Sequence, residues 1–387
     1  MRSTTRKTEP KTAELDSSGL TRRRFLRGTG VVGTVAAAAF PMTAMAQQPV
    51  ALRLQGAWSA KDIFHEYALD FAKKINDMSG GRLRVEVLPA GAVVKTPELQ
   101  DAVHKGIIDG CHAVPALWLA RDAAFSLFGT GPALGMDANG FLAWMRHGGG
   151  MELYTDLIHR QLNLNVVPFF CGPMPTQPLG WFKKPVKSSA DFKGLKIRAT
   201  GLAADLFREM GARVETLSDQ DIVAALKSGK IDAAQSNNAS SDLSLGLPEA
   251  AKFCMLQSYH QPAQAFEVLI NRRKFDALPA ELQAIVRYAA EASSADMSWK
   301  ALHRYTEDQA RMRDKHGVSF HKTPMEVQRA QMKAWAAVAA RQAGHSPFFD
   351  RVWQSQQAWA RRTVGWSRDT LVDSAVAHDF WFGQRRK

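Results

Sequence analysis

The chain has 387 residues, of which 45% are apolar and 22% are charged. That length accommodates two domains with hydrophobic cores, and the composition excludes a disordered, collagen-like or coiled-coil chain as a description of the whole. The net charge is +13, but residues 1–46 contain eight Lys and Arg against three acidic residues, and no basic stripe interleaved with aromatic side chains follows. The charge therefore does not indicate a nucleic-acid partner.

Residues 1–46 have the pattern of an export signal. Residues 21–27 read Thr-Arg-Arg-Arg-Phe-Leu-Arg, an Ala- and Gly-rich apolar run follows at 31–40, and Ala44-Met45-Ala46 is a small-x-small cleavage site. The paired arginines resemble a twin-arginine export signal. A membrane anchor is the alternative, but a span needs about 20 strongly apolar residues, and this run is shorter. We therefore expect a twin-arginine signal peptide and a mature chain in the periplasm.

The mature chain alternates between strand and helix patterns. The first half predicts strands at 51–55, 83–88 and 110–114, with helices from Ser59 to Ser79 and from Pro97 to Lys105. This order predicts a mostly parallel sheet covered by helices. A similar series follows, with strands at 166–170, 180–182, 195–198 and 213–216 and helices at 203–210 and 221–227. Beyond Pro279 the chain is helical, at 279–315, 324–343 and roughly 349–376.

A local repeat relates the two halves. Residues 98–110 and 221–233 each contain an amphipathic helix, a Gly that ends it, and an Ile-Asp pair that enters a short strand. One such unit in each half favours two related α/β domains over chance similarity. Two domains joined by crossing strands would enclose a cleft, which is the usual place for a small ligand.

The sequence lacks the common motifs of catalytic sites. The sequence has no Gly-x-Ser-x-Gly elbow, P-loop, His-Glu-x-x-His or Rossmann glycine pattern, which favours a binding protein over an enzyme. Three cysteines, Cys111, Cys171 and Cys254, have no CxxC spacing and allow at most one bridge. The sequence leaves their redox state open.

Two polar features are candidates for binding. Arg198 ends a predicted strand, where a guanidinium is well placed to clamp a carboxylate with two parallel hydrogen bonds. Gln235-Ser236-Asn237-Asn238 follows another short strand with a run of neutral hydrogen-bonding side chains. A surface arginine and a simple polar turn are the alternative interpretations.

These motifs together resemble a known family. The export signal, Ser-Gly-Gly-Arg82-Leu, Gly-Leu-Lys-Ile-Arg198 and Gly-Lys-Ile-Asp-Ala-Ala234 are similar in order and spacing to the solute-binding (DctP-like) subunit of a tripartite ATP-independent periplasmic (TRAP) transporter. The resemblance covers most of residues 50–315. It is closest to the branch that binds 2-oxo acids and related monocarboxylates, in which Thr176-Gln177-x-x-Gly-Trp181-Phe182 also occurs.

The resemblance implies a two-lobed α/β periplasmic binding fold that closes on an organic acid, with an arginine, here Arg198, on the carboxylate. It also implies a Na⁺ or Ca²⁺ ion beside the ligand, held in part by a glutamine that falls on Gln177. Where the branch has a further carboxylate ligand and then a tryptophan, this chain has Gln235 and Ser236. An amide binds a hard cation more weakly than a carboxylate, so the sequence leaves the cation open. Serine in place of tryptophan predicts a larger or more polar acid than pyruvate.

Three more positions complete the predicted site. His260 and Gln261 fall where the branch lines its pocket, and Trp58 follows the first strand, where the other lobe would meet the ligand. Core packing is the alternative for Trp58.

The sequence thus predicts a periplasmic protein that binds a small 2-oxo, 2-hydroxy or other carboxylate and delivers it to TRAP membrane subunits. An exported enzyme acting on an acid and a ligand-sensing binding protein are the alternatives. The long helical C-terminal region, which contains Trp353, Trp359, Trp366 and Trp381, indicates either a homodimer or packing against the first lobe. The expected division is a signal at 1–46, a first lobe of 47–170 with about 265–315, a second lobe of 171–264, and C-terminal helices at 316–387.

Overall fold

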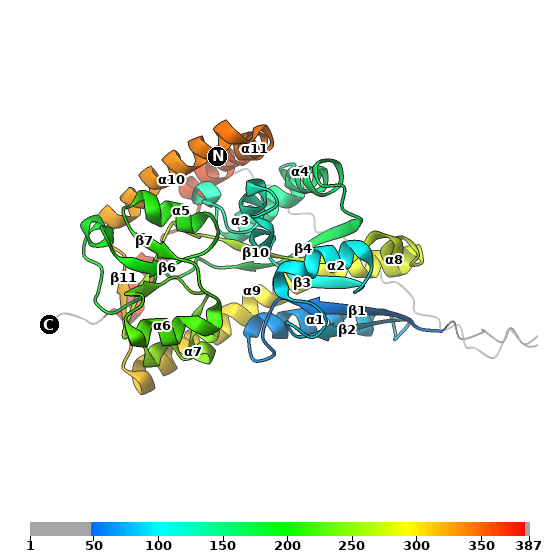
Figure 1. Cartoon of the computed structure of the whole chain (residues 1–387), viewed down its shortest axis with the longest axis horizontal. Coiled ribbons are helices and arrows are strands. Elements are labelled where there is room, and N and C mark those ends of the chain that lie inside the picture. Colours follow the sequence, from blue (N-terminus) through cyan, green and yellow to red (C-terminus); the bar gives the residue numbers. More distant parts are fainter. Residues whose placement is uncertain (1–47, 384–387) are drawn as a thin grey trace, which may run out of the picture. The chain divides into compact units, whose positions relative to one another are not determined.

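Strands of the described chain form two separate sheets (Figure 1). The computed structural model describes residues 48–383, so the predicted twin-arginine signal at 1–46 lies outside the described residues. The first sheet has the order β2-β1-β3-β10-β4, and the second has the order β11-β9-β5-β8-β6-β7. The strands of the first sheet are β1 (Val50–Gly56), β2 (Leu83–Leu88), β3 (Gly110–Ala113), β4 (Val166–Met174) and β10 (Gln264–Asn271). Those of the second are β5 (Gly180–Phe182), β6 (Lys196–Arg198), β7 (Arg213–Glu215), β8 (Ala233–Ala234), β9 (Phe253–Leu256) and β11 (Ser319–Lys322).

Helices surround both sheets. They are α1 (Ile63–Met78), α2 (Leu99–Lys105), α3 (Ala138–His147), α4 (Gly150–Asp156), α5 (Gly201–Glu209), α6 (Ile222–Ser228), α7 (Ala239–Leu245), α8 (Arg272–Asp276), α9 (Ala280–His316), α10 (Met325–His345), α11 (Pro347–Thr370) and α12 (Ser374–Phe382). Helix α1 begins after Asp62, whose side chain accepts a hydrogen bond from the backbone N–H of Phe64, so Asp62 is the cap and not Ser59. Across residues 48–383, no helix is both long and apolar enough to cross a membrane.

Both sheets are mixed rather than mostly parallel. Strands β1, β2 and β3 are parallel as predicted, but β10 runs antiparallel to β3 and β4. The reason is that β4 leads the chain out of the first sheet and β10 leads it back in beside β4, so these two strands run in opposite directions. A further difference lies in the predicted C-terminal helical region, 316–387, which also contains β11, a strand that pairs with β9 of the second sheet.

The sequence repeat corresponds to the same unit in both sheets. Helices α2 and α6 each end at a glycine with positive φ, Gly106 at 75° and Gly229 at 77°, a backbone conformation that favours glycine. The aspartates that follow, Asp109 and Asp232, each exchange hydrogen bonds with the neighbouring parallel strand: the Asp109 side chain accepts from the backbone of Arg53 and the Asp232 side chain from that of Lys196. Similar sequence therefore builds a similar helix–strand step in each sheet.

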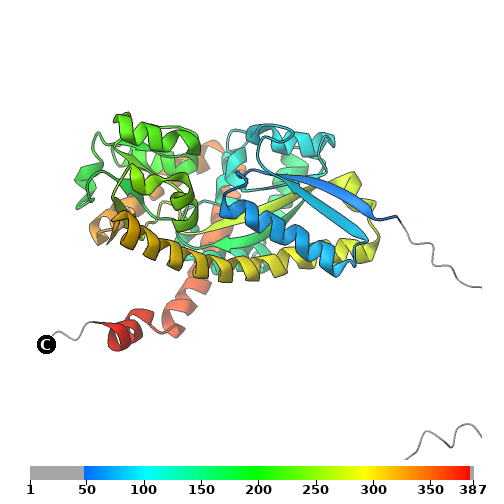
Figure 2. The ribbon, with the colours of Figure 1, turned by 90° about the horizontal axis from the view of Figure 1, so that it is seen from below.

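Three connections join the two sheets. The chain passes from β4 to β5 and returns from β9 to β10, and helix α9, with 37 residues, is about 55 Å long. Figure 2 shows α9 running beneath both halves. It packs on α1 and β4 at the first sheet and on α7 at the second. Helix α10 packs on α5 and on α11, and α11 packs on α3 and α4, so this hairpin also spans both halves.

The core contains three free cysteines and, in the first sheet, one buried carboxylate. Cys111, Cys171 and Cys254 are all buried and free, so none of them forms a bridge. Glu267 lies in the middle of β10, fully buried, and accepts hydrogen bonds from the Trp118 indole, at 2.6 Å, and from the Tyr154 hydroxyl. Burial raises the pKa of Glu267 to about 7.

The raised pKa makes stability depend on pH. Glutamate has an ordinary pKa near 4.5, so between pH 4.5 and about 7 the folded chain binds a proton at Glu267 that the unfolded chain has released. This contribution to stability is present below pH 4.5 and is lost as the pH rises through about 7. Between pH 5 and pH 8, wild type should therefore lose about 2–3 kcal/mol of unfolding free energy through Glu267. The Glu267→Gln variant has no carboxyl group at this position, so we expect its unfolding free energy to fall by that much less.

The measurement is the free energy of unfolding by denaturant across that pH range. Subtracting the profile of the variant from that of wild type removes the contributions of the titratable groups that the two proteins share. The Glu86→Gln variant, at an exposed position of β2, serves as the control and should follow the wild-type profile. Parallel profiles for wild type and Glu267→Gln would contradict the assignment.

Candidate functional site

Four of the predicted site residues meet at the carboxamide of Gln177, which lies on the segment between β4 and β5. The Gln177 Oε1 atom is 2.8 Å from Gln235 Nε2 and 2.8 Å from His260 Nε2, and its Nε2 atom donates to Asn237 Oδ1 at 3.3 Å. We call Gln177, Gln235, Asn237 and His260 the amide cluster. Its members come from three segments distant in sequence, which the crossing connections bring together.

His260 is held in one uncharged form. Because a carboxamide oxygen only accepts, His260 carries its proton on Nε2 and donates to Gln177. Its Nδ1 atom then accepts from the Ser258 hydroxyl at 2.6 Å. Burial lowers the pKa of His260 to about 3, so the ring stays neutral.

Helix α10 fixes the loop that carries His260. Gln331 on α10 is fully buried, donates to Ser258 Oγ at 2.8 Å and accepts from the backbone N–H of Tyr259 at 2.9 Å. The Trp335 indole donates to the Tyr259 carbonyl at 2.6 Å. The C-terminal helices therefore help to position a side chain of the site.

Arg198 lies beside the amide cluster at the end of β6, and only 6% of its surface is exposed. Nε donates to the Leu217 carbonyl at 3.0 Å, and Nη1 donates to the Gln235 carbonyl at 2.9 Å. Nη2 forms an ion pair with Asp219 at 2.6 Å, and the Asp219 side chain is 46% exposed. Two backbone carbonyls thus fix the guanidinium, while its charged partner is accessible to water and able to exchange.

Gln235 and Ser236 point to different neighbours. The Gln235 Oε1 atom accepts from the backbone N–H of Thr200 at 3.1 Å, which sets the orientation of its amide. The Ser236 hydroxyl donates to Asp242 at 2.5 Å, and Asp242 also accepts from the Trp181 indole at 2.7 Å. Burial raises the pKa of Asp242 to about 6. The Ser236 side chain is therefore engaged with Asp242 rather than with the amide cluster.

Asn238 has a capping role. Its side chain accepts from the backbone of Ser240 and Ser241, both at 3.0 Å, and so caps α7. The Ser241 hydroxyl in turn donates to Asp62, the cap of α1, at 3.0 Å. This contact joins a helix of the second sheet to a helix of the first, and burial raises the pKa of Asp62.

Trp58 and Gln261 have other contacts. The Trp58 indole donates to His112 Nδ1 at 2.8 Å and packs edge-on against Phe64 and Phe266. Among residues 48–383, no hydrogen bond joins Trp58 to the amide cluster. The Gln261 carbonyl accepts from the backbone N–H of Gln177 at 3.1 Å, and its amide donates to Gln264 at 3.0 Å.

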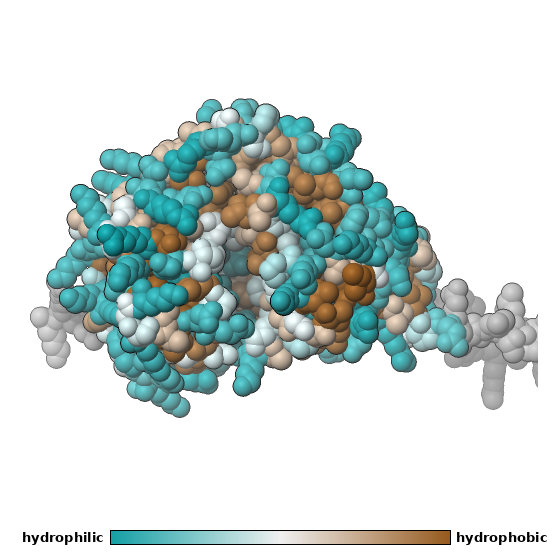
Figure 3. Space-filling view, in the orientation of Figure 1, coloured by the Kyte–Doolittle hydropathy of each residue, from teal (hydrophilic) through white to brown (hydrophobic). Residues whose placement is uncertain are grey.

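Three hollows are places where a ligand could bind. Figure 3 shows the surface hollowed near its middle, between the regions of β6 and β3. A cavity of about 170 Å³ lies beside the cluster, and Thr176, Asn237, Gln264 and Tyr305 are among the residues that line it.

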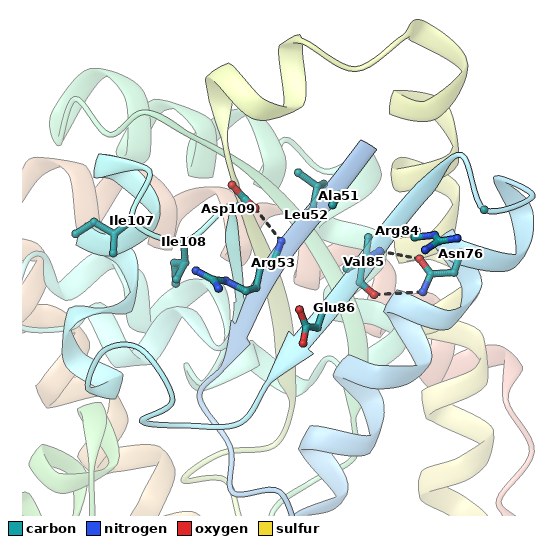
Figure 4. Close-up of a pocket in the computed structure, with 11 residues that line it drawn as sticks. Ala51, Leu52, Arg53, Asn76, Arg84, Val85, Glu86, Ile107, Ile108 and Asp109 are labelled. Carbon is teal, nitrogen blue, oxygen red and sulfur yellow. Dashed lines mark hydrogen bonds between the residues drawn. The ribbon is translucent and has the colours of Figure 1, made fainter. Parts of the chain in front are cut away.

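A larger depression, of about 740 Å³, lies on the first sheet at β1 and β2 (Figure 4). It is lined in part by Arg53, Arg84, Glu86 and Asp109 and contains no residue of the amide cluster. It is therefore separate from the candidate site.

Sequence reasoning missed three residues of the site. Asp219 pairs with Arg198, a contact that no sequence motif indicates. Asp242 and Gln331 carry no motif, and their roles depend on contacts with residues distant in the chain. Only burial within a folded structure distinguishes them from ordinary polar helix residues.

The chain matches a known family. Residues 54–344 match the family described as bacterial extracellular solute-binding protein, family 7 (DctP). A monocarboxylate 2-oxoacid-binding periplasmic protein of Nostoc sp. is 28% identical over 304 residues, which cover 77% of this chain and 80% of that protein.

Two solved structures are similar in fold. A TRAP periplasmic solute-binding protein of Pseudoalteromonas atlantica with bound sodium and pyruvate is 26% identical, with a TM-score of 0.77 over 87% of this chain and all of that one. A TRAP transporter solute-binding protein of Bordetella bronchiseptica, a dimer with calcium and picolinate in one site, is 23% identical, with a TM-score of 0.78 over 86% of this chain and 97% of that one.

These similarities confirm the predicted two-lobed α/β fold. They also confirm the prediction that the chain is a binding protein and not an enzyme. Because the family match spans most of the chain, the protein belongs to the DctP family of TRAP solute-binding proteins, bacterial extracellular solute-binding protein family 7.

Proposed function

We propose that this protein binds a small organic acid in the periplasm, with its carboxylate on Arg198, and delivers it to the membrane subunits of a TRAP transporter. The observation that carries the proposal is a buried guanidinium beside a cluster of neutral hydrogen-bonding side chains. The names of the Nostoc relative, which binds monocarboxylate 2-oxo acids, and of the Pseudoalteromonas structure, with pyruvate, support an acid as the ligand.

Arg198 has N–H groups available for a ligand. Each terminal guanidinium nitrogen carries two hydrogens, and each uses one of them, on Gln235 and on Asp219. The remaining pair would bond both oxygens of a carboxylate, an arrangement that is strong because donor and acceptor are charged. Two backbone carbonyls already orient the guanidinium, so little side-chain entropy is lost on binding.

We further propose that binding closes two lobes, 47–170 with about 265–315 and 171–264, and that 316–387 is a separate C-terminal region, which contains β11 as well as helices. The hinges would be the crossing segments between β4 and β5 and between β9 and β10, because the backbone angles of a few residues there can absorb the movement. The hydrogen bond between Asp62 and Ser241 joins helices of the two lobes, and it would form only when the lobes are close.

The direct test removes the guanidinium. We expect Arg198→Ala to weaken binding of an acid by about 2–5 kcal/mol, roughly 30-fold or more, because the carboxylate loses its charged partner. Arg198→Lys keeps the charge but not the paired donors and should weaken binding less. The measurement is isothermal titration with whichever of pyruvate, lactate and their longer homologues raises the melting temperature of wild type most.

Arg208→Ala is the matched control, because Arg208 lies on α5 in an exposed pair with Asp205. Circular dichroism and thermal melting without ligand show whether each variant is folded. Unchanged affinity in a folded Arg198→Ala protein would show that Arg198 does not hold the carboxylate.

We also propose that the C-terminal helices support a homodimer. Helix α12 presents its large apolar side chains to solvent: Val376 is 70%, Phe380 76%, Trp381 72% and Phe382 76% exposed. Such a patch on a monomer is unfavourable in water, and a second copy of this chain is its proposed partner. The dimer in the name of the Bordetella structure supports that choice.

Deletion of residues 371–387 tests the dimer. We expect the mature full chain to have the mass of a dimer by size-exclusion chromatography with light scattering, and the truncated chain that of a monomer, because the exposed apolar surface of α12 is removed. A full chain that is monomeric at tens of micromolar, or a truncated chain that is still dimeric, would contradict the role of α12.

A further inference from the structure

We propose that this site binds its acid without a metal ion and takes 2-hydroxy acids in preference to 2-oxo acids, an inference that rests on the proposed function. Sodium and pyruvate are bound in the Pseudoalteromonas structure, and calcium and picolinate in the Bordetella structure. The residues of this chain do not fit such a cation, for reasons of both hydrogen bonding and charge.

The amide oxygens that would coordinate a cation already accept hydrogen bonds. A carboxamide oxygen has two lone pairs, and Gln177 Oε1 accepts from both Gln235 and His260. Gln235 Oε1 accepts from the backbone N–H of Thr200. An N–H that points at an oxygen and a cation compete for the same lone pairs, so a cation would have to break this network.

Charge in the pocket is also unfavourable for a cation. The amide cluster contains no carboxylate, and its His260 is neutral. Asp242 bonds Trp181 and Ser236, and the charge of Asp219 is offset by Arg198, so neither carboxylate brings an uncompensated negative charge to the cluster. Hard cations prefer several carboxylate and carbonyl oxygens. In the part of the chain that the structure describes, no three His, Cys, Asp or Glu side chains are grouped to hold a metal ion.

Free polar groups near the cluster favour a hydroxyl. Within residues 48–383, the Nδ2 atom of Asn237 donates to no other residue, and Gln261 Oε1 accepts from none. Asn237 lines the cavity and Gln261 directly follows His260, so one donor and one acceptor lie close to the cluster. A hydroxyl on C2 of the acid uses both, whereas a carbonyl on C2 only accepts. Without a cation, a 2-oxo acid also loses the advantage of presenting two oxygens to one ion.

The cavity beside the cluster gives room for a substituent on C2. It measures about 170 Å³, and apolar groups of Met174, Pro178 and Phe320 form part of its lining. Asn237 belongs to both the cavity lining and the cluster, so a ligand held at the cluster borders this space. The test therefore includes acids with a small and with a large side chain.

The test is calorimetric titration of the mature full chain in buffer freed of divalent ions and sodium, with two matched pairs of probes. The pairs are lactate with pyruvate and mandelate with phenylglyoxylate, and the members of each pair differ only in a hydroxyl or carbonyl on C2. We expect the hydroxy acid of at least one pair to bind about tenfold more tightly, the effect of one additional hydrogen bond. Added Ca²⁺ or Na⁺ should change each dissociation constant by less than about twofold.

Each contrary result has its own meaning. Tightening of pyruvate or phenylglyoxylate by about tenfold or more with Ca²⁺ or Na⁺, or a metal ion retained in equal amount to the protein by elemental analysis, would overturn the cation-free site. Oxo acids that bind as tightly as their hydroxy partners would overturn the ligand class. If none of the four acids binds in either buffer, the proposed function itself fails.

Gln235→Glu tests the reason given for the missing cation. A carboxylate at this position adds a charged oxygen ligand beside Gln177, so we expect Ca²⁺ to tighten pyruvate binding in this variant and not in wild type. The control is Gln309→Glu, which adds the same charge on α9 at the cavity but outside the cluster. Binding by Gln235→Glu that is as insensitive to Ca²⁺ as in wild type would contradict the role assigned to position 235.

Discussion

The arrangement of this site depends on the carboxamide of Gln177. Its oxygen accepts from Gln235 and His260, and its nitrogen donates to Asn237, so one side chain joins three segments of the chain. Each bond alone contributes on the order of 1 kcal/mol, but a buried donor left without its acceptor costs more than that. Loss of any one of these bonds is therefore strongly unfavourable. The complete network fixes the positions of the crossing segments relative to each other.

The supports of this network extend well beyond the pocket. Gln331 and Trp335 on α10 hold the loop that carries His260, and α10 also packs on α5, near Arg198. Helix α9 spans both sheets and passes close to β4, where a side chain in place of Gly172 would overlap Met297. The C-terminal helices thus support the candidate site through contacts that lie outside it.

Much of this structure could be predicted from local sequence patterns. The periodicity of apolar residues predicted β1, α1 and β2, and the repeated helix–glycine–strand unit predicted that the two halves are related. Strand β10 was not predicted, because all its residues are buried and no alternation is visible, while Glu267 in its middle argues against burial until Trp118 and Tyr154 are seen to satisfy it. At the site, Arg198 and Gln177 were predicted. Asp219 and Gln331 were not, since only tertiary contacts give them their roles.

A crystal structure of the mature protein with a bound acid would show directly which side chains hold the carboxylate. We expect an acid between the two lobes, with both carboxylate oxygens within hydrogen-bond distance of the Arg198 guanidinium and its C2 substituent against Asn237 and Gln261. We also expect that only protein atoms and water surround the ligand beside Gln177. An acid bound away from Arg198, for example in the depression on β1 and β2, or a cation coordinated by Gln177 and Gln235, would contradict this arrangement.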